Sequence, residues 1–215
     1  LIIIFICSMK RILTITFIIL FFYLFVLLLR PNIYYLLVNT GFLAEEVRIS
    51  GTGSMYPTFP KSSSEYDIVR ARDIVASAKM RRYPGGINLW GKQLFSYEIG
   101  YGDIVEFEND KTKSISLAKY GDQAGFVKRV IALAGDKLEF RDGYVYRNGA
   151  VMDEPYTAKP RSTYGGEILA DCQVLTVPAG KIFVLGDNRK ASLDSRHELG
   201  LVDKNDTHFV ISWKD

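Results

Sequence analysis

The hydrophobic residues of this chain form one long run near the N-terminus and then many short runs separated by turn residues. From Ile12 to Leu29 the sequence ILTITFIILFFYLFVLLL contains 18 residues without a charge, a glycine or a proline. As a helix this run would span roughly 27 Å at about 1.5 Å per residue, close to the ~30 Å hydrocarbon thickness of a bilayer. Lys10 and Arg11 precede it, and Arg30 follows it. The pattern predicts a transmembrane helix.

A cleavable signal peptide is the alternative interpretation of this run. Its apolar core would be unusually long compared with the usual ~7–15 residues, and no small-x-small cleavage site precedes Arg30. We therefore expect an uncleaved signal anchor. Met9, followed by Lys10 and Arg11, has the form of a usual start for such an anchor, so the true N-terminus is either Leu1 or Met9.

Downstream of the anchor, short β-branched and aromatic runs replace any long helical stripe. Asp142-Gly143 and Asn148-Gly149 are two tight-turn signals, and they predict a three-stranded meander. Further strands are expected within residues 102–107, 125–133, 173–180 and 181–188, and loops at 109–124 and 157–171. Residues 60–100 receive no assignment. The fold class is therefore mainly β, with an N-terminal transmembrane helix followed by a β-rich ectodomain.

These patterns divide the chain into three parts. Residues 1–30 form the N-terminal segment with the anchor, whose span is about 12–29; residues 31–46 form a juxtamembrane linker; and residues 47–215 form the β-rich ectodomain.

Composition and charge exclude several classes of protein. With 48% hydrophobic and 24% charged residues among 215, a wholly disordered chain is excluded. The net charge of +3 comes from Lys10, Arg11 and Arg30, so the ectodomain is neutral and lacks the basic field of a nucleic-acid binder. Two cysteines and two histidines, far apart in sequence, favour neither a disulfide framework nor a metal site.

The first candidate for chemistry is Ser54, in GTGSMYPTF after a run typical of a strand end. Gly53 allows unusual backbone dihedral angles, and Pro57 stiffens the exit of the turn. Such a turn can expose a hydroxyl with backbone N–H groups nearby for an oxyanion. Taken alone, the stretch is more typical of a plain turn serine.

The second candidate is Lys128, in the apolar run GFVKRVIAL. On a strand its side chain shares one face with Phe126 and Val130. An ammonium group on an apolar face loses solvation, which lowers its pKa and would allow it to act as a general base. The alternative is an edge-strand lysine whose aliphatic stem covers apolar surface.

The third candidate is GDNRKASLDSR, residues 186–196, which is rich in small polar residues and follows a hydrophobic strand. Asp187 and Asn188 suit a turn, and Asp194 is placed to pair with Arg196. A surface loop is the alternative interpretation. Metal binding by Asp187 and Asp194 is not favoured, because oxygen-ligand sites usually need more carboxylates in register.

Together, SGTGSMYPT, YGDIVEF, VKRVIALAGD and GDNRKASLDSR, in this order behind an anchor, resemble the successive sequence boxes of type I signal peptidases. The similarity covers most of residues 47–202. One departure lies in the lysine box, where Ala132 and Ala134 stand at positions that are commonly Gly and Pro in the family.

The resemblance implies a serine endopeptidase with a Ser–Lys dyad and no metal or other cofactor. Ser54 would be the nucleophile and Lys128 the general base, and Thr52 with the Ser54 N–H would form the oxyanion hole. Ser192 would orient the lysine amine, and Met55 would line a small pocket for the residue before the cleaved bond. Structural support of the site would come from Asp187, Asn188, Asp194 and Arg196.

The partners implied by the resemblance are preproteins bearing signal peptides and a lipid bilayer, with no nucleic acid; we expect a monomer. A lysine base is typical of the enzymes of the bacterial plasma membrane or, as an alternative, of the mitochondrial inner membrane. The N-terminus would be cytoplasmic and the catalytic domain on the outer face. Rival hypotheses are a peptidase that matures one dedicated secretion, pilus or conjugation substrate, and an inactive membrane-anchored binding domain.

Overall fold

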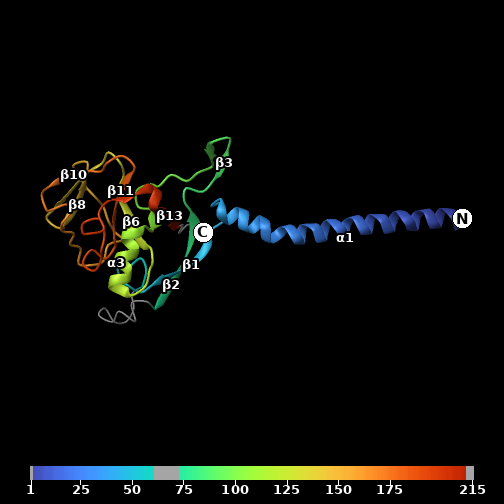
Figure 1. The fold of residues 1–215 in the computed structure, drawn as a ribbon, viewed down its shortest axis with the longest axis horizontal. Helices are drawn as coiled ribbons and strands as arrows, with labels where there is room; N and C mark the ends of the chain where they lie inside the picture. The colour runs from blue at the N-terminus through green and yellow to red at the C-terminus, as the bar shows by residue number, and fades with distance from the viewer. Residues whose placement is uncertain (1, 61–72, 212–215) are drawn as a thin grey trace.

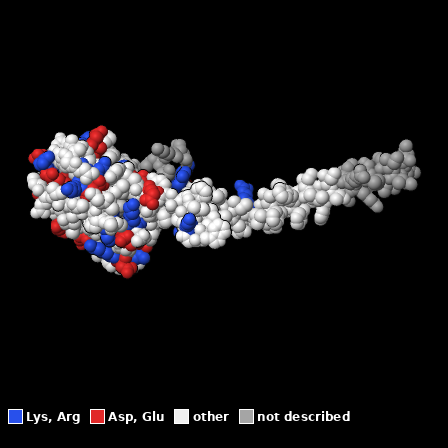
Figure 2. Space-filling view, turned by 90° about the horizontal axis from the view of Figure 1, so that it is seen from above, with Lys and Arg blue, Asp and Glu red and all other residues white. Residues whose placement is uncertain are grey.

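The long apolar run forms a single helix that projects from a β-rich head (Figure 1). The structure is a computed structural model and describes residues 2–60 and 73–211. Helix α1 (Ile2–Asn39) continues through Pro31, so the first residues of the predicted linker are helical. Its segment Thr14–Asn39 has a mean hydropathy of 2.2 and is long and apolar enough to cross a membrane. Figure 2 shows few charges on the part of this helix that is not drawn in grey, whereas basic and acidic side chains are interspersed over the head.

The head is built from a large curled sheet and two smaller ones. The seven-stranded sheet has the order β1-β2-β13-β5-β6-β11-β12, the four-stranded sheet has the order β10-β7-β8-β9, and β3 pairs with β4. All of the strand pairs are antiparallel. The strands are β1 (Glu45–Ser50), β2 (Ile74–Arg82), β3 (Ile87–Leu89), β4 (Lys92–Leu94), β5 (Ile104–Phe107), β6 (Phe126–Ala132), β7 (Lys137–Arg141), β8 (Tyr144–Arg147), β9 (Ala150–Val151), β10 (Val174–Thr176), β11 (Lys181–Leu185), β12 (Val202–Asp203) and β13 (Thr207–Ile211).

The mainly β prediction is confirmed, including its individual strands. The four predicted runs contain β5, β6, β10 and β11, and the predicted meander is β7-β8-β9. Both of its turns have positive φ at each central residue: 54° and 77° at Asp142 and Gly143, and 54° and 81° at Asn148 and Gly149. These are the dihedral signs that a two-residue turn needs if it is to follow the twist of its strands.

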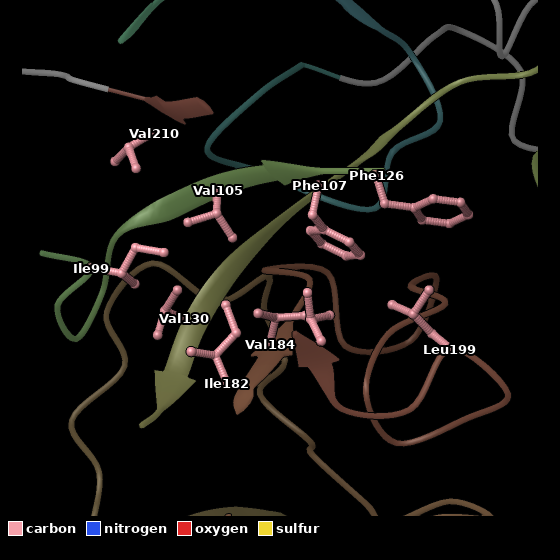
Figure 3. Packing of buried hydrophobic residues seen from close by; sticks show 10 residues of the cluster. Ile99, Val105, Phe107, Phe126, Val130, Ile182, Val184, Leu199 and Val210 are labelled. Carbon is pink, nitrogen blue, oxygen red and sulfur yellow. The ribbon is translucent and has the colours of Figure 1, made fainter. Parts of the chain in front are cut away.

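The core lies where β5, β6 and β11 pack their apolar side chains together. Figure 3 shows Val105 and Phe107 beside Phe126, Val130 and Val184. Val105, Phe107, Val130 and Val184 are fully buried, and the rings of Phe107 and Phe126 lie 6.3 Å apart. Alternate residues of β6 thus carry the core, and Lys128 lies between Phe126 and Val130 on this face.

The prediction of a loop at residues 109–124 is wrong for its central part, which forms helix α3 (Asp110–Tyr120). The sequence DKTKSISLAKY lacks a clear apolar stripe, which is why its pattern did not indicate a helix. The ends of the helix are specified instead by local hydrogen bonds. Asn109 and Thr112 form a reciprocal capping box, and Gly121 ends the helix with φ 69°.

Residues 73–100, which the sequence left unassigned, contain an inner strand and a protruding hairpin. Strand β2 pairs with both β1 and β13, and so joins the N- and C-terminal parts of the sheet. The β3–β4 hairpin carries Trp90 at its tip with 99% of its surface exposed. Phe95 just beyond it contacts Phe42 near the end of α1, at 6.0 Å between ring centroids.

A first prediction concerns the cap of α3. In Asn109→Ala the helix loses an acceptor for the Thr112 N–H and a donor to Asp206, 2.7 Å away. We expect the free energy of unfolding of the full-length chain in detergent to fall by about 1–2 kcal/mol, the usual range for a lost N-cap. Urea unfolding followed by near-ultraviolet circular dichroism measures it.

Ser114→Ala is the matched control in the same helix. Its hydroxyl bonds only to the exposed Asp110 carbonyl at 2.8 Å, so its removal should leave stability nearly unchanged. Equal stability of the two variants would refute the role of the capping box.

Candidate active site

Ser54 lies in a tight turn directly after β1, with its side chain half-buried. Gly53 has φ 75°, a region that side chains disfavour, so a glycine suits this position. The turn is attached to the core by the buried side chains of Met55 and Phe59, which pack in one hydrophobic cluster. The Ser54 hydroxyl therefore sits on a turn that is packed against the core.

Lys128 reaches the same point from β6. Its Nζ lies 3.0 Å from Ser54 Oγ and 2.8 Å from the Val127 carbonyl oxygen, and it is 5.4 Å from the centre of the Phe126 ring. The side chain is almost wholly buried, as its place on the apolar face predicted. Burial lowers the pKa of Lys128 from 10.5 to about 8, while the charges of Asp194 and Asp187 oppose this shift more weakly.

Thr52 lies beside the pair and donates a hydrogen bond from Oγ1 to Ser54 Oγ at 3.3 Å. The Ser54 N–H donates to none of the described residues. A hydroxyl and a free backbone N–H thus lie next to the Ser54 oxygen, a combination that can bind a developing oxyanion.

Asp187 and Asn188, which follow β11, form hydrogen bonds with the turn that carries Ser54. The Asn188 N–H donates to the Ser54 carbonyl at 3.0 Å, and Asn188 Nδ2 donates to the Gly53 carbonyl at 3.1 Å. Asp187 is fully buried and accepts a hydrogen bond from Thr58 on the same turn. The segment after β11 therefore fixes the position of the nucleophile candidate.

Asp194 and Arg196 form a buried ion pair beneath this segment. Arg196 Nε and Nη2 lie 2.8 and 2.9 Å from the two carboxylate oxygens of Asp194. Burial acts to raise the pKa of Asp194, but the hydrogen bond and charge of Arg196, with the Gly186 N–H and the Ser192 hydroxyl, hold the pKa below its ordinary value. Asp194 thus remains ionised close to Lys128.

Ser192 lies at the site but makes no hydrogen bond to Lys128. Its Oγ is buried and has no hydrogen-bond partner of good geometry among the described residues, although it lies close enough to Asp194 to help lower the pKa of that residue. A Cβ atom on Gly186 would overlap Ser192 Oγ and the Ser54 carbonyl oxygen. Gly186 is therefore required for the close approach of these two segments.

Sequence reasoning missed Arg129 as a member of this cluster. Its Nε and Nη2 lie 2.8 and 2.7 Å from the Asp187 carboxylate oxygens, and its guanidinium group stacks 4.1 Å from the centre of the Tyr156 ring. An arginine in an otherwise apolar strand signals a buried acidic partner, but nothing in the sequence says which one. A second buried pair, Arg189 with Glu154 at 2.6 Å, gave no signal at all.

A cavity of about 400 Å³ opens at Ser54 and Lys128. Residues of β1, from Val47 to Ser50, line one wall, and Gly125 to Lys128 line another; Met55 and Phe59 also contribute. β1 is the terminal strand of the sheet, so one of its edges is unpaired within the described residues. The cavity is therefore bordered by strand backbone as well as by side chains.

The start of β6 also presents an open edge. β11 pairs with β6 only at Arg129, Val130 and Ala132. The N–H and carbonyl of Val130 bond toward the β5 side, at 2.8 and 2.9 Å, so by alternation those of Val127 point to the other side. β11 has ended there, and no described strand covers that edge of Val127.

Comparison with known proteins places the chain in a family. A family model described as signal peptidase, peptidase S26, matches residues 12–210. Signal peptidase I of Bacillus licheniformis is 38% identical over 124 residues, which cover 53% of this chain and 61% of that protein. Signal peptidase I S of Bacillus subtilis (strain 168) is 44% identical over 88 residues, covering 39% of this chain and 48% of that protein.

Among solved structures, signal peptidase I from Enterococcus faecalis V583 matches with 29% identity and a TM-score of 0.41, over 54% of this chain and 97% of that chain. The matches to these two Bacillus relatives span about half to three-fifths of their length. Since the family model matches nearly the whole chain, including the anchor and all four sequence boxes, the chain belongs to the signal peptidase family, peptidase S26.

Proposed function

We propose that this chain is a membrane-anchored serine endopeptidase that removes signal peptides from exported preproteins by a Ser–Lys dyad. The observation that carries the proposal is the 3.0 Å distance between Lys128 Nζ and Ser54 Oγ at the mouth of a cavity, with the lysine desolvated. With the pKa of Lys128 near 8, a substantial fraction of the amine is neutral at physiological pH and can accept a proton.

In the first step, the neutral Lys128 amine takes the Ser54 proton as Oγ attacks the carbonyl carbon of the scissile bond. Negative charge develops on the carbonyl oxygen, and the Ser54 N–H and the Thr52 hydroxyl would stabilise it. The lysine ammonium then returns its proton to the departing amine, and an acyl-enzyme remains. Lys128, neutral again, activates a water molecule that hydrolyses the ester and frees Ser54.

The substrate would bind as an extended strand between β1 and the start of β6. Both walls present strand edges that pair with no other described strand, and main-chain hydrogen bonds to such edges are a common way of binding peptides. Met55 would line a shallow pocket for the residue before the cleaved bond. Because Met55 and Phe59 are packed into the core, this pocket favours a small residue such as alanine.

The proposed location is the plasma membrane of a bacterium, with α1 crossing the bilayer once. The catalytic part, residues 47–215, would face the outer side, where exported preproteins emerge, and the N-terminus would be cytoplasmic.

The central prediction concerns the dyad. Ser54→Ala and Lys128→Met should each reduce cleavage of a preprotein with an Ala-x-Ala site by at least ~10³-fold, because a nucleophile and its base act as one unit. Full-length protein in detergent and product masses from mass spectrometry provide the measurement. Cleavage by either variant at the wild-type rate would exclude the dyad.

The substrate range of wild type is a separate question, tested with a panel of preproteins. Cleavage of only one preprotein from the panel would indicate a dedicated peptidase.

The pH profile of kcat/KM tests the desolvated base. Lys128 must be neutral to accept the proton, so the rate should rise with pH through about 8 and then level off. A solvated lysine would instead give a rise centred near ~10.4. A profile still climbing steeply at pH 10 would contradict a buried base.

Asn188→Ala tests the support of the serine turn. It removes the Nδ2 hydrogen bond to the Gly53 carbonyl but keeps the backbone bond to Ser54. We expect kcat/KM to fall by about fivefold, corresponding to one hydrogen bond of about 1 kcal/mol. The exposed neighbour Lys190 is the control: Lys190→Ala should act like wild type. Equal rates for both variants would show that the serine turn does not need the Asn188 side chain.

A further inference from the structure

Glu106 is a half-buried acidic residue in the wall of the cavity at Ser54. It lies in β5 between the fully buried Val105 and Phe107 and lines the same cavity as Ser54 and Lys128. Its Oε2 atom is buried and has no hydrogen-bond partner among the described residues. A buried carboxylate oxygen without a partner is energetically costly, so its presence in a binding cavity calls for a ligand.

The backbone opposite Glu106 is shaped to accommodate its carboxylate. Glu106 pairs with Val127 across the sheet, so Gly125 is its diagonal neighbour on the same face. A Cβ atom at position 125 would overlap Glu106 Oε1 and press on the Phe107 carbonyl at 3.1 Å. Any residue other than glycine at this position would displace the carboxylate from its place.

Arg48 and Lys128 line the same cavity as Glu106, but neither forms an ion pair with it. Burial and the nearby charge of Glu108 raise the pKa of Glu106 to about 7. Lys113 in α3 is paired with Glu108 at 3.0 Å and not with Glu106. Asp122 lines the same cavity and adds negative charge. Among the described residues, none forms an ion pair with Glu106.

We infer that Glu106 forms a subsite for a basic side chain, lysine or arginine, of a bound preprotein close to its cleavage site. This inference rests on the proposed function and deepens it by naming a class of substrate. The substrate ammonium or guanidinium group would reach Oε2 in a partly desolvated setting, where an ion pair contributes more than at an open surface. Gly125 provides the room on one side, and the open edge at Val127 holds the peptide backbone next to it.

The test compares lysine with norleucine, which has a similar length and no charge. The two residues are placed in turn at each position flanking an Ala-x-Ala cleavage site, and kcat/KM is measured with the full-length chain in detergent at pH 8.5. At one position wild type should prefer lysine by at least about tenfold. Glu106→Gln should reduce that preference to less than about twofold, and Glu106→Lys should favour glutamate there instead.

Glu108→Gln is the matched control on the same strand end. Glu108 is already paired with Lys113, so this variant should keep the lysine preference. The ratio of the lysine rate to the norleucine rate within Glu106→Gln does not depend on the amount of folded enzyme, which separates a specificity defect from a folding defect.

Binding to Ser54→Ala, measured by fluorescence anisotropy with the same labelled peptides, makes the test independent of catalysis. A lysine preference in binding that disappears in Ser54→Ala/Glu106→Gln would support the subsite even if no peptide were cleaved. Equal binding of lysine and norleucine peptides at every position, or a preference that survives Glu106→Gln, would overturn it.

Discussion

The proposed catalytic arrangement depends on the removal of water from the amine of Lys128. Lys128 sits on the core face of β6, where Phe126 and Val130 exclude solvent. Two carboxylates lie near enough to favour its ammonium form, Asp187 and Asp194, but each is held by an arginine of its own. The arginines thereby limit how far these acids can restore the charge of the lysine, and desolvation prevails. The two ion pairs, Asp187–Arg129 and Asp194–Arg196, therefore help to keep the pKa of Lys128 low.

The geometry is assembled from three segments that are distant in sequence. The serine turn follows β1, the lysine lies on β6, and the segment that fastens the turn follows β11. The close approach of the first and third segments needs Gly186, because any side chain there would meet Ser192 and the Ser54 carbonyl. The absence of a side chain at Gly186 is thus as necessary to the site as the presence of Ser54, the proposed nucleophile.

Local patterns predicted much of the fold and part of the site. Alternation and turn residues were sufficient for β5 to β11, because each of these strands has one buried face or a tight turn beside it. Helix α3 escaped prediction since its stability comes from caps at Asn109 and Gly121 and not from an apolar stripe. Ser54 and Lys128 were candidates from their local patterns, and the family resemblance supplied their roles. Arg129 and Glu106 could not be assigned, because the side chains around them come together only once β5 and β6 have paired and the later loops have packed. Ser192 lies where expected, yet without the expected hydrogen bond to the lysine.

The short link between helix and sheet affects how tightly substrates need to bind. α1 ends at Asn39 and β1 begins at Glu45, so only five residues separate the helix from β1, which lines one wall of the cavity at Ser54. A substrate carried in the same bilayer would meet this wall by diffusion in two dimensions, at a local concentration far above its average in the cell. The cavity would then need only a weak intrinsic affinity for its substrate, and a weakly bound product would leave quickly. Proximity to the lipid would replace much of the recognition that a freely diffusing protease must build into its contacts.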